Sequence, residues 1–234
     1  PFFNEKAVCE LGKNLDKSKK LHRSGTEYAL KVLKRFSEIL NVSKITNLKI
    51  IATAVIREAT DTKPFIDEVE KLFKTKINIL SGEEEAKCTA EGVKIGFENV
   101  DGLVADLGGG SLELARVENN IVTNKTSLPV GVLRLLNNPI VKKRNLAKYI
   151  KKLLREEKWL SKKKFNNLYL VGGTWRALFK LHLFQNNHPV HIIHQYSIDN
   201  NVLSKFVEKI SSFNKSKLKT VEYISKSRTP YLPY

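Results

Sequence analysis

Apolar and polar residues follow two periods along the first half of the chain, one helical and one extended. Apolar positions at helical spacing predict a helix that begins at a capping box over 24–27 (SGTE). The β-branched run 48–56 (LKIIATAVI) predicts a buried strand. Two further helices are predicted to begin at Pro64 and Ser81, with a short strand over 77–80 between them.

The second half of the chain continues this alternation of strands and helices. Its predicted elements are, in order, strands over 103–107, 112–117 and 121–128, a basic amphipathic helix, a strand over 168–171 and a helix that ends near Phe184. Strands that alternate with helices indicate an α/β fold. We place a boundary between the third helix and the three-stranded meander, which gives domains 1–98 and 99–234.

The charge of the 234-residue chain points to polyanionic partners. Forty-one Lys and Arg against 24 Asp and Glu give a formal net charge of +17, which favours nucleic acid, an anionic membrane or polyphosphate. The alternative is that lysine is simply the default surface residue, because the lysines are spread along the whole chain. No apolar run approaches the ~20 residues that span a bilayer. Cys9 and Cys88 form neither a disulfide framework nor a metal spacing, which predicts a cytoplasmic protein.

Three consecutive glycines, Gly108, Gly109 and Gly110, join the first two strands of the predicted meander. Residues without a side chain let successive N–H groups converge on one anion, and Ser111 adds a hydroxyl donor. The turn is not a P-loop, because it lacks the lysine of that motif and leads into a strand rather than a helix. It predicts a phosphate-binding loop, and a tight hairpin that binds no ligand is the alternative.

Carboxylates flank this glycine turn on both sides. Asp106 ends the preceding strand, where it could hold a divalent cation beside a bound anion. Glu113 follows Ser111 by two residues, so their side chains lie on the same face of the next strand. The sequence therefore predicts a cation next to a phosphate.

Two further clusters carry charges that suit a catalytic site. Glu83, Glu84 and Glu85 begin a predicted helix, where they either complement the helix dipole or raise one another's pKa toward that of a general base. Arg57 leaves the end of a predicted strand, where sites of α/β proteins usually lie. It either contacts phosphate oxygens or pairs with Glu58 on the surface.

Three other features leave alternatives open. The turn over 172–174 (GGT) either binds phosphate at a helix N-terminus or is only a close-packed turn. The spacing of His188, His191 and His194 in a β-rich stretch does not bring three rings together, so we expect packed or surface histidines. The basic helix presents either a solvated face or a surface that guides polyphosphate, and its charged positions include Lys148, Lys151, Lys152 and Arg155.

Five segments of the chain, taken in order, match the motifs of one family. They are ATAVIREA, ILSGEEEA, GLVADLGGGSLEL, SLPVGVLRL and VGGTWRAL. The set resembles the exopolyphosphatase/guanosine pentaphosphate phosphatase family of the actin-like ATPase and sugar-kinase superfamily, over nearly the whole chain. The resemblance implies an enzyme with two actin-like (ribonuclease H-like) α/β domains and the active site in the cleft between them. It also implies release of terminal phosphate from inorganic polyphosphate or from guanosine pentaphosphate.

The resemblance implies a role for each charged residue of these motifs. Glu85 would be the base that activates water, and Arg57 would stabilise the transferred phosphoryl group. Asp106, with Glu113 as a further acidic residue, would hold Mg²⁺, and the glycine loop with Ser111 would hold the phosphate. These roles agree with the chemistry, because phosphoryl transfer needs preorganised donors and a metal more than covalent help.

The chain departs from the family pattern at its N-terminus. The family begins with a strand that carries Asp-x-Gly-Ser-x-Ser, the first of two phosphate loops, and the chain starts just downstream of that strand. We therefore expect an N-terminally truncated member whose first domain lacks its first strands. The alternative is an inactive remnant that at most binds polyanions. The expected partners are polyphosphate or guanosine pentaphosphate, without nucleic acid or membrane, and a homodimer is left open.

Overall fold

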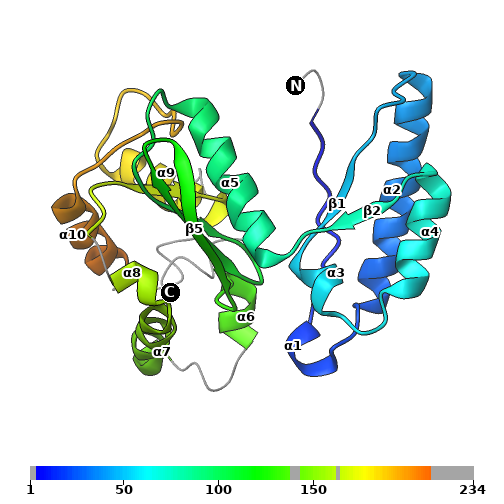
Figure 1. The fold of residues 1–234 in the computed structure, drawn as a ribbon, viewed down its shortest axis with the longest axis horizontal. Coiled ribbons are helices and arrows are strands. Elements are labelled where there is room, and N and C mark those ends of the chain that lie inside the picture. The colour runs from blue at the N-terminus through cyan, green and yellow to red at the C-terminus, as the bar shows by residue number, and fades with distance from the viewer. Residues whose placement is uncertain (1–3, 138–142, 162–163, 212–234) are drawn as a thin grey trace. The chain divides into compact units, whose positions relative to one another are not determined.

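The structure is a computed structural model of an α/β protein (Figure 1). It describes residues 4–137, 143–161 and 164–211. Helices and strands alternate along these residues, which confirms the predicted fold class. Within the described ranges, no helix is both long and apolar enough to cross a membrane.

Two compact units make up the chain, Pro1–Glu85 and Ala86–Tyr234. Their division falls inside helix α5 (Gly82–Gly96), upstream of the boundary predicted between 98 and 99. The physical reason is that Ala90 of α5 is completely buried in the core of the second unit, so most of the helix belongs to that unit. The order of elements along the chain could not show which core this helix enters.

The first unit packs helices against a two-stranded parallel sheet (Figure 1). Its elements are α1 (Leu15–Ser18), α2 (Arg23–Val42), β1 (Ile50–Ala52), α3 (Ala54–Glu58), α4 (Lys63–Phe73) and β2 (Ile77–Ile79). Ala29 of α2 and the α4 residues Phe65 and Val69 are buried together in its core. The helix predicted from Pro64 and the strand predicted after it are confirmed.

One local prediction for this unit is wrong, and another is confirmed except for its capping box. The run 48–56 is a strand only in β1, whose three residues pair with the three residues of β2. The chain then turns into α3, in which Ala54 is buried as part of a helix. The helix expected at 24–27 exists, but it already begins at Arg23, and its N-cap residue His22 makes no side-chain cap. Apolar runs alone do not distinguish a buried strand from a buried helix.

A four-stranded sheet with the order β5–β4–β3–β6 forms the centre of the second unit. β3, β4 and β5 are an antiparallel meander, and β6 pairs parallel to β3. Their bounds are Gly102–Leu107, Leu112–Glu118, Ile121–Leu128 and Leu168–Val171. The turn between β4 and β5 holds Asn119 and Asn120 at φ angles of 49° and 64°, a conformation that asparagine tolerates. The predicted meander and the later strand are confirmed.

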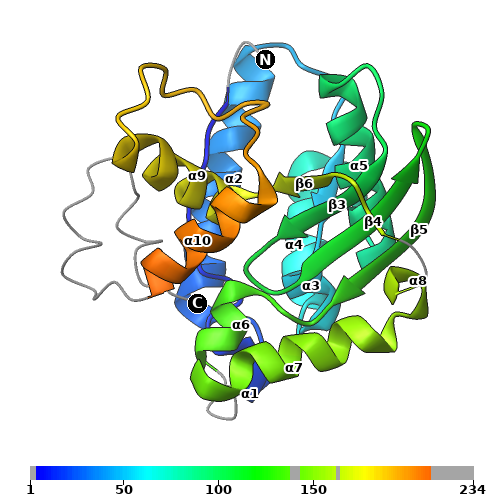
Figure 2. The ribbon, with the colours of Figure 1, turned by 90° about the vertical axis from the view of Figure 1, so that its left-hand side faces the viewer.

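Helices cover both faces of this sheet (Figures 1 and 2). α5 packs on the face that carries Val104, Ala115 and Val117. The opposite face, with Ala105 and Leu114, packs against α7 and α8. The bounds of these and the other helices of the unit are α6 (Val132–Asn137), α7 (Lys143–Glu156), α8 (Lys158–Ser161), α9 (Gly173–Gln185) and α10 (Asn200–Ser211). The sequence did not predict α10, which packs against α9.

Candidate active site

Arg57 and Glu85 form an ion pair within the first unit. Arg57 lies in the last turn of α3, and Glu85 lies in the first turn of α5. The Nη1 group of Arg57 donates to Glu85 Oε1 and, at 2.5 Å, to the carbonyl oxygen of Leu80. The two side chains are only 26% and 15% exposed, so this is not a freely solvated surface pair. Arg57 thus has a partner that neither sequence alternative, phosphate or Glu58, included.

Two neighbouring carboxylates in the first turn of α5, Glu84 and Glu85, make different interactions. The N–H of Ser81 donates to Glu84 Oε2 at 2.7 Å, and the N–H of Glu84 donates to Ser81 Oγ at 3.2 Å. This confirms the predicted capping box. The backbone bond from Ser81 and the bond to its side chain hold the pKa of Glu84 below its usual value. For Glu84 this contradicts one of the two sequence alternatives, the one in which neighbouring carboxylates raise the pKa. Glu84 thus forms the cap, and Glu85 pairs with Arg57.

Asp106, Glu113 and Ser127 form a polar row across three strands of the second unit. Asp106 of β3 lies directly opposite Glu113 of β4, which in turn lies opposite Ser127 of β5. Ser127 Oγ donates to Glu113 Oε1 at 2.8 Å, and Glu113 is only 5% exposed. Directly opposed residues share a sheet face, with Cβ atoms about 5 Å apart. The structure therefore brings the two predicted cation ligands together and adds Ser127, which the sequence analysis missed.

The carboxylate of Asp106 is enclosed by α5 and by the turn before α9. Thr89 Oγ1 of α5 donates to Asp106 Oδ2 at 3.2 Å. A Cβ on Gly172, whose φ is 104°, would lie 2.6 Å from Asp106 Oδ1, so glycine is required there. Burial raises the pKa of Asp106, while the Thr89 hydrogen bond and the positive charge of Arg176 oppose this shift. The turn over 172–174 is thus close-packed, one of its two predicted alternatives.

The three glycines of the loop differ in whether their backbone N–H groups are hydrogen-bonded. The N–H of Gly108 donates to the carbonyl oxygen of Ser111 at 2.9 Å and closes the turn. The N–H groups of Gly109 and Gly110 donate to no acceptor among the residues that the structure describes. Ser111 itself is only 6% exposed. Of the glycine amides assigned to phosphate, those of Gly109 and Gly110 are therefore the ones available to an anion.

Gly131 supports this loop, although the sequence analysis assigned it no role. The N–H groups of Val132 and Leu133 in α6 donate to the carbonyl oxygens of Gly108 and Gly109, at 3.2 and 3.0 Å. A Cβ on Gly131 would lie 2.2 Å from Gly109 O and 2.3 Å from the carbonyl carbon of Gly109. Only glycine permits this contact. The signal that could have found it is the single glycine between two valines in the segment SLPVGVLRL.

The Asp106–Glu113 pair fits Mg²⁺ better than a metal that needs many protein ligands. Among the described residues, no group of three His, Cys, Asp or Glu side chains could hold a metal ion. Mg²⁺ commonly uses one or two carboxylates and completes its shell with waters and substrate phosphates. The histidines do not add to this pair: His188 Nδ1 lies 2.7 Å from the carbonyl oxygen of Val190. The stretch 186–199 contains no strand, so the expected β-rich environment is wrong.

We expect Asp106→Asn to stabilise the metal-free protein. The folded-state pKa of Asp106 lies above its ordinary value of 3.8, so the ionised carboxylate opposes folding at neutral pH. Asn keeps an acceptor for Thr89 and removes the buried charge. The expected gain at pH 7 stays below about 1 kcal/mol, because solvent partly screens this incompletely buried carboxylate, and it is measured as a rise in Tm by calorimetry with a chelator present. The gain should shrink as the pH falls from the raised pKa toward 3.8; a lower Tm at pH 7 would contradict the argument.

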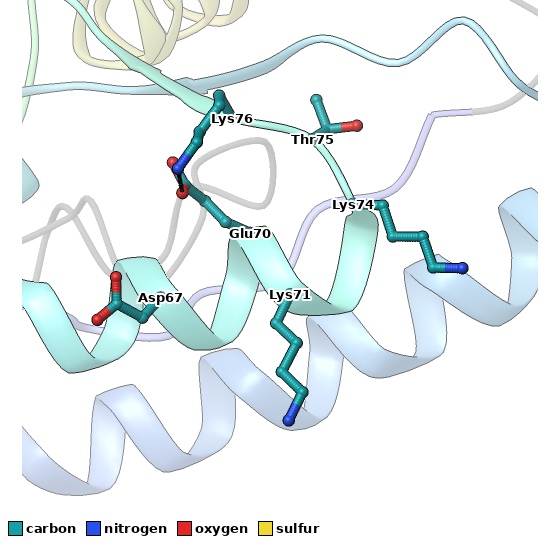
Figure 3. Close-up of a pocket in the computed structure, with 6 residues that line it drawn as sticks. All are labelled: Asp67, Glu70, Lys71, Lys74, Thr75 and Lys76. Carbon is teal, nitrogen blue, oxygen red and sulfur yellow. Dashed lines mark hydrogen bonds and ion pairs between the residues drawn. The ribbon is translucent and has the colours of Figure 1, made fainter.

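A separate shallow pocket lies at the C-terminal end of α4 in the first unit (Figure 3). Glu70 within it accepts hydrogen bonds from Lys76 Nζ at 2.5 Å and from the N–H of Ile77 at 3.0 Å. The Lys76 bond first, and then the Ile77 bond, lower the pKa of Glu70. The pocket contains none of the predicted site residues; its lining is Asp67, Glu70, Lys71, Lys74, Thr75 and Lys76. The hydrogen bonds of Glu70 connect α4 to the start of β2.

Sequence comparisons connect the whole chain to phosphatases. The Ppx/GppA phosphatase family matches residues 1–233. The chain is 36% identical over 134 residues to guanosine-5'-triphosphate,3'-diphosphate pyrophosphatase of Aeromonas hydrophila, which covers 57% of the chain and 27% of that protein. It is 29% identical over 241 residues to the bifunctional 3-dehydroquinate synthase/phosphatase of Fusobacterium nucleatum, which covers 94% of the chain and 35% of that protein. The chain thus spans about a third or less of these relatives.

Solved structures show the same fold over almost the entire chain. An exopolyphosphatase from Cytophaga hutchinsonii has a TM-score of 0.83 at 20% identity, over 99% of this chain and 78% of that one. The Ppx/GppA family member from Aquifex aeolicus has a TM-score of 0.75 at 19% identity, over 97% of this chain and 76% of that one. At such identities the likeness establishes the fold alone. Together with the family match over residues 1–233, it shows that the chain belongs to the Ppx/GppA phosphatase family.

Proposed function

We propose that this protein is a phosphohydrolase that cleaves the terminal phosphoanhydride bond of inorganic polyphosphate or of guanosine pentaphosphate. The observation that carries this proposal is the carboxylate pair Asp106–Glu113 beside a loop in which the N–H groups of Gly109 and Gly110 donate to no acceptor in the described part of the chain. A terminal phosphate needs cation ligands and anion donors at one place, and this strand end offers both. The pyrophosphatase and exopolyphosphatase relatives support the same class of substrate.

In the proposed reaction, Glu85 is the general base. Its carboxylate takes a proton from water while the water oxygen attacks the terminal phosphorus. The bond between phosphorus and the bridging oxygen breaks, and the shortened chain leaves with the bonding electron pair. Arg57 orients Glu85 through their ion pair. Because a guanidinium has five N–H donors, Arg57 can also contact phosphoryl oxygens without releasing the carboxylate.

Mg²⁺ is the proposed cofactor, held by Asp106 and Glu113. When bound, it would offset the negative charge of the phosphoryl oxygens. The buried position of Asp106 fits this role, because a cation favours the ionised form that burial disfavours. Thr89 and Ser127 hold one oxygen of each carboxylate by hydrogen bonds, which fixes the orientation of the pair.

The proposal is tested by the release of inorganic phosphate from long-chain polyphosphate and from guanosine pentaphosphate. We expect release that requires Mg²⁺, and removal of the ion with EDTA should lower the rate by about 100-fold or more, since a metal contributes several kcal/mol to charge stabilisation. The ratio of the two rates assigns the preferred substrate. Release that is unchanged in EDTA would reject the metal role of Asp106 and Glu113. A folded protein that releases phosphate from neither substrate would favour the inactive remnant.

A further inference from the structure

Positive charge is concentrated in one short part of the chain, although lysines occur throughout it. Positions 142–164 contain eleven Lys and Arg and two Glu, a net charge of +9 out of the total +17. About a tenth of the residues thus carries more than half of the net charge. A default surface preference for lysine does not account for this concentration.

The structure places much of this charge on the outer side of α7. The inner side of the helix packs into the core through Leu146, Tyr149, Ile150, Leu153 and Leu154. The outer side exposes a single stripe of cations at spacings of three, four and seven residues, namely Lys148, Lys151, Lys152 and Arg155. Lys158 of α8 is exposed beyond its end. We call these five residues the basic face.

The basic face is separate from the proposed active site. α7 packs on the sheet face that carries Ala105 and Leu114. Asp106 comes one residue after Ala105, and Glu113 comes one residue before Leu114. Successive side chains of a strand point to opposite faces, so both carboxylates point to the face on which α5 packs. The basic face therefore lies across the sheet from the carboxylates and cannot hold the same phosphate as they do.

Two other polyanions fit the basic face less well than a plain phosphate chain. Binding of single-stranded nucleic acid usually relies on aromatic rings on which the bases stack, but Tyr149 and Trp159 both pack against the core. A membrane-bound amphipathic helix inserts its apolar side into the bilayer. The apolar side of α7 is already buried in the protein core. What remains is a ligand recognised by charge alone.

We propose that the basic face is a second binding site for long inorganic polyphosphate, which anchors the chain away from the point of cleavage. Lys148 to Arg155 extends over about 10 Å of helix, so several cations meet consecutive phosphates. Among the residues that the structure describes, Lys152 is the member of the basic face that pairs with a carboxylate, with 3.8 Å between its Nζ and Glu156 Oε1. The choice of polyphosphate rests on the proposed phosphoanhydride chemistry, whereas the presence of a polyanion site rests on the charge pattern alone.

A binding measurement tests this proposal without any turnover. In the test variant, Lys148, Lys151, Lys152 and Arg155 are all replaced by Gln, which removes four charges and keeps helix propensity. The matched control removes four exposed helical lysines elsewhere, namely Lys31, Lys71, Lys180 and Lys205. Affinity for long-chain polyphosphate is measured by titration over a range of salt concentrations, with circular dichroism to verify the fold.

We expect the test variant to bind long-chain polyphosphate at least about tenfold more weakly at low salt. The slope of log K against log salt should fall by about 3, since each lost contact removes about 0.7. The affinity of the control variant should stay close to that of the unmodified protein.

Equal losses of affinity in both variants would show general charge attraction and overturn the proposal. Tighter binding of single-stranded RNA or of anionic vesicles than of polyphosphate would overturn the choice of ligand. Failure of phosphate release would reject the proposed function and leave this binding result standing.

Discussion

Glu85→Gln is expected to lower the rate of phosphate release by about 10³-fold, within the range that general bases contribute. Gln keeps the length of the side chain, and its carbonyl oxygen can still accept the hydrogen bond from Arg57. It cannot take a proton from water. The fold should therefore remain while the proposed chemistry stops, and kcat should fall with little change in KM because Glu85 need not touch the substrate in the ground state.

The matched control is Glu84→Gln, which changes the neighbouring carboxylate in the same way. Gln at this position can still accept from the N–H of Ser81, as capping boxes allow. We expect its rate to stay within about threefold of the unmodified protein. Both rates are measured at saturating Mg²⁺. If Glu85→Gln keeps its turnover, or if Glu84→Gln loses it instead, the assignment of the base to Glu85 is wrong.

Gly131→Ala is expected to displace the glycine loop and to abolish measurable phosphate release. The added Cβ would overlap the backbone of Gly109, with contacts of 2.2 and 2.3 Å to atoms that cannot rotate away. Overpacking of this kind costs about 3 kcal/mol, which corresponds to a fall of roughly 6–12 °C in Tm. Because the loop must move to relieve the overlap, activity should be lost even at temperatures where the protein is folded.

Gly92→Ala is the matched control for this substitution. Gly92 lies in the interior of α5, and a Cβ there would meet nothing within 4 Å. Alanine is a better helix former than glycine, so this change should stabilise the protein by about 1 kcal/mol and leave phosphate release intact. Tm and rate are measured for both variants. A Gly131→Ala protein with unchanged Tm and full activity would show that the contact between Gly131 and the loop is dispensable.

The strands of the second unit were easier to predict than those of the first. Alternation and the glycine and asparagine turns gave the meander and the strand over 168–171 nearly at their observed bounds, because both signals are local. In the first unit, the run 48–56 has the same apolar residues whether it is a strand or a helix. The strand covers only Ile50–Ala52, the residues that pair with β2, and the chain enters α3 at Ala54; that pairing depends on a segment elsewhere in the chain.

The interaction partners of the site residues also depend on distant parts of the chain rather than on local patterns. A simple hairpin with the turn at Asn119 and Asn120 would place Glu113 opposite residue 126. A β-bulge at Arg116/Val117 shifts the register by one residue, so Glu113 meets Ser127 instead. Arg57 likewise pairs with Glu85, far along the chain, rather than with its neighbour. Neither pairing could be read from spacing.

By itself, the sequence determined the α/β class, the family motifs and the residue types that can bind phosphate or act as a base. These features depend on composition and short-range order, which the chain carries wherever it folds. The tertiary structure alone decided that Asp106 is buried beside Gly172, that Gly131 supports the loop and that the basic face lies across the sheet from the carboxylates. Such contacts depend on strand register and on the close approach of distant segments, which local patterns do not encode.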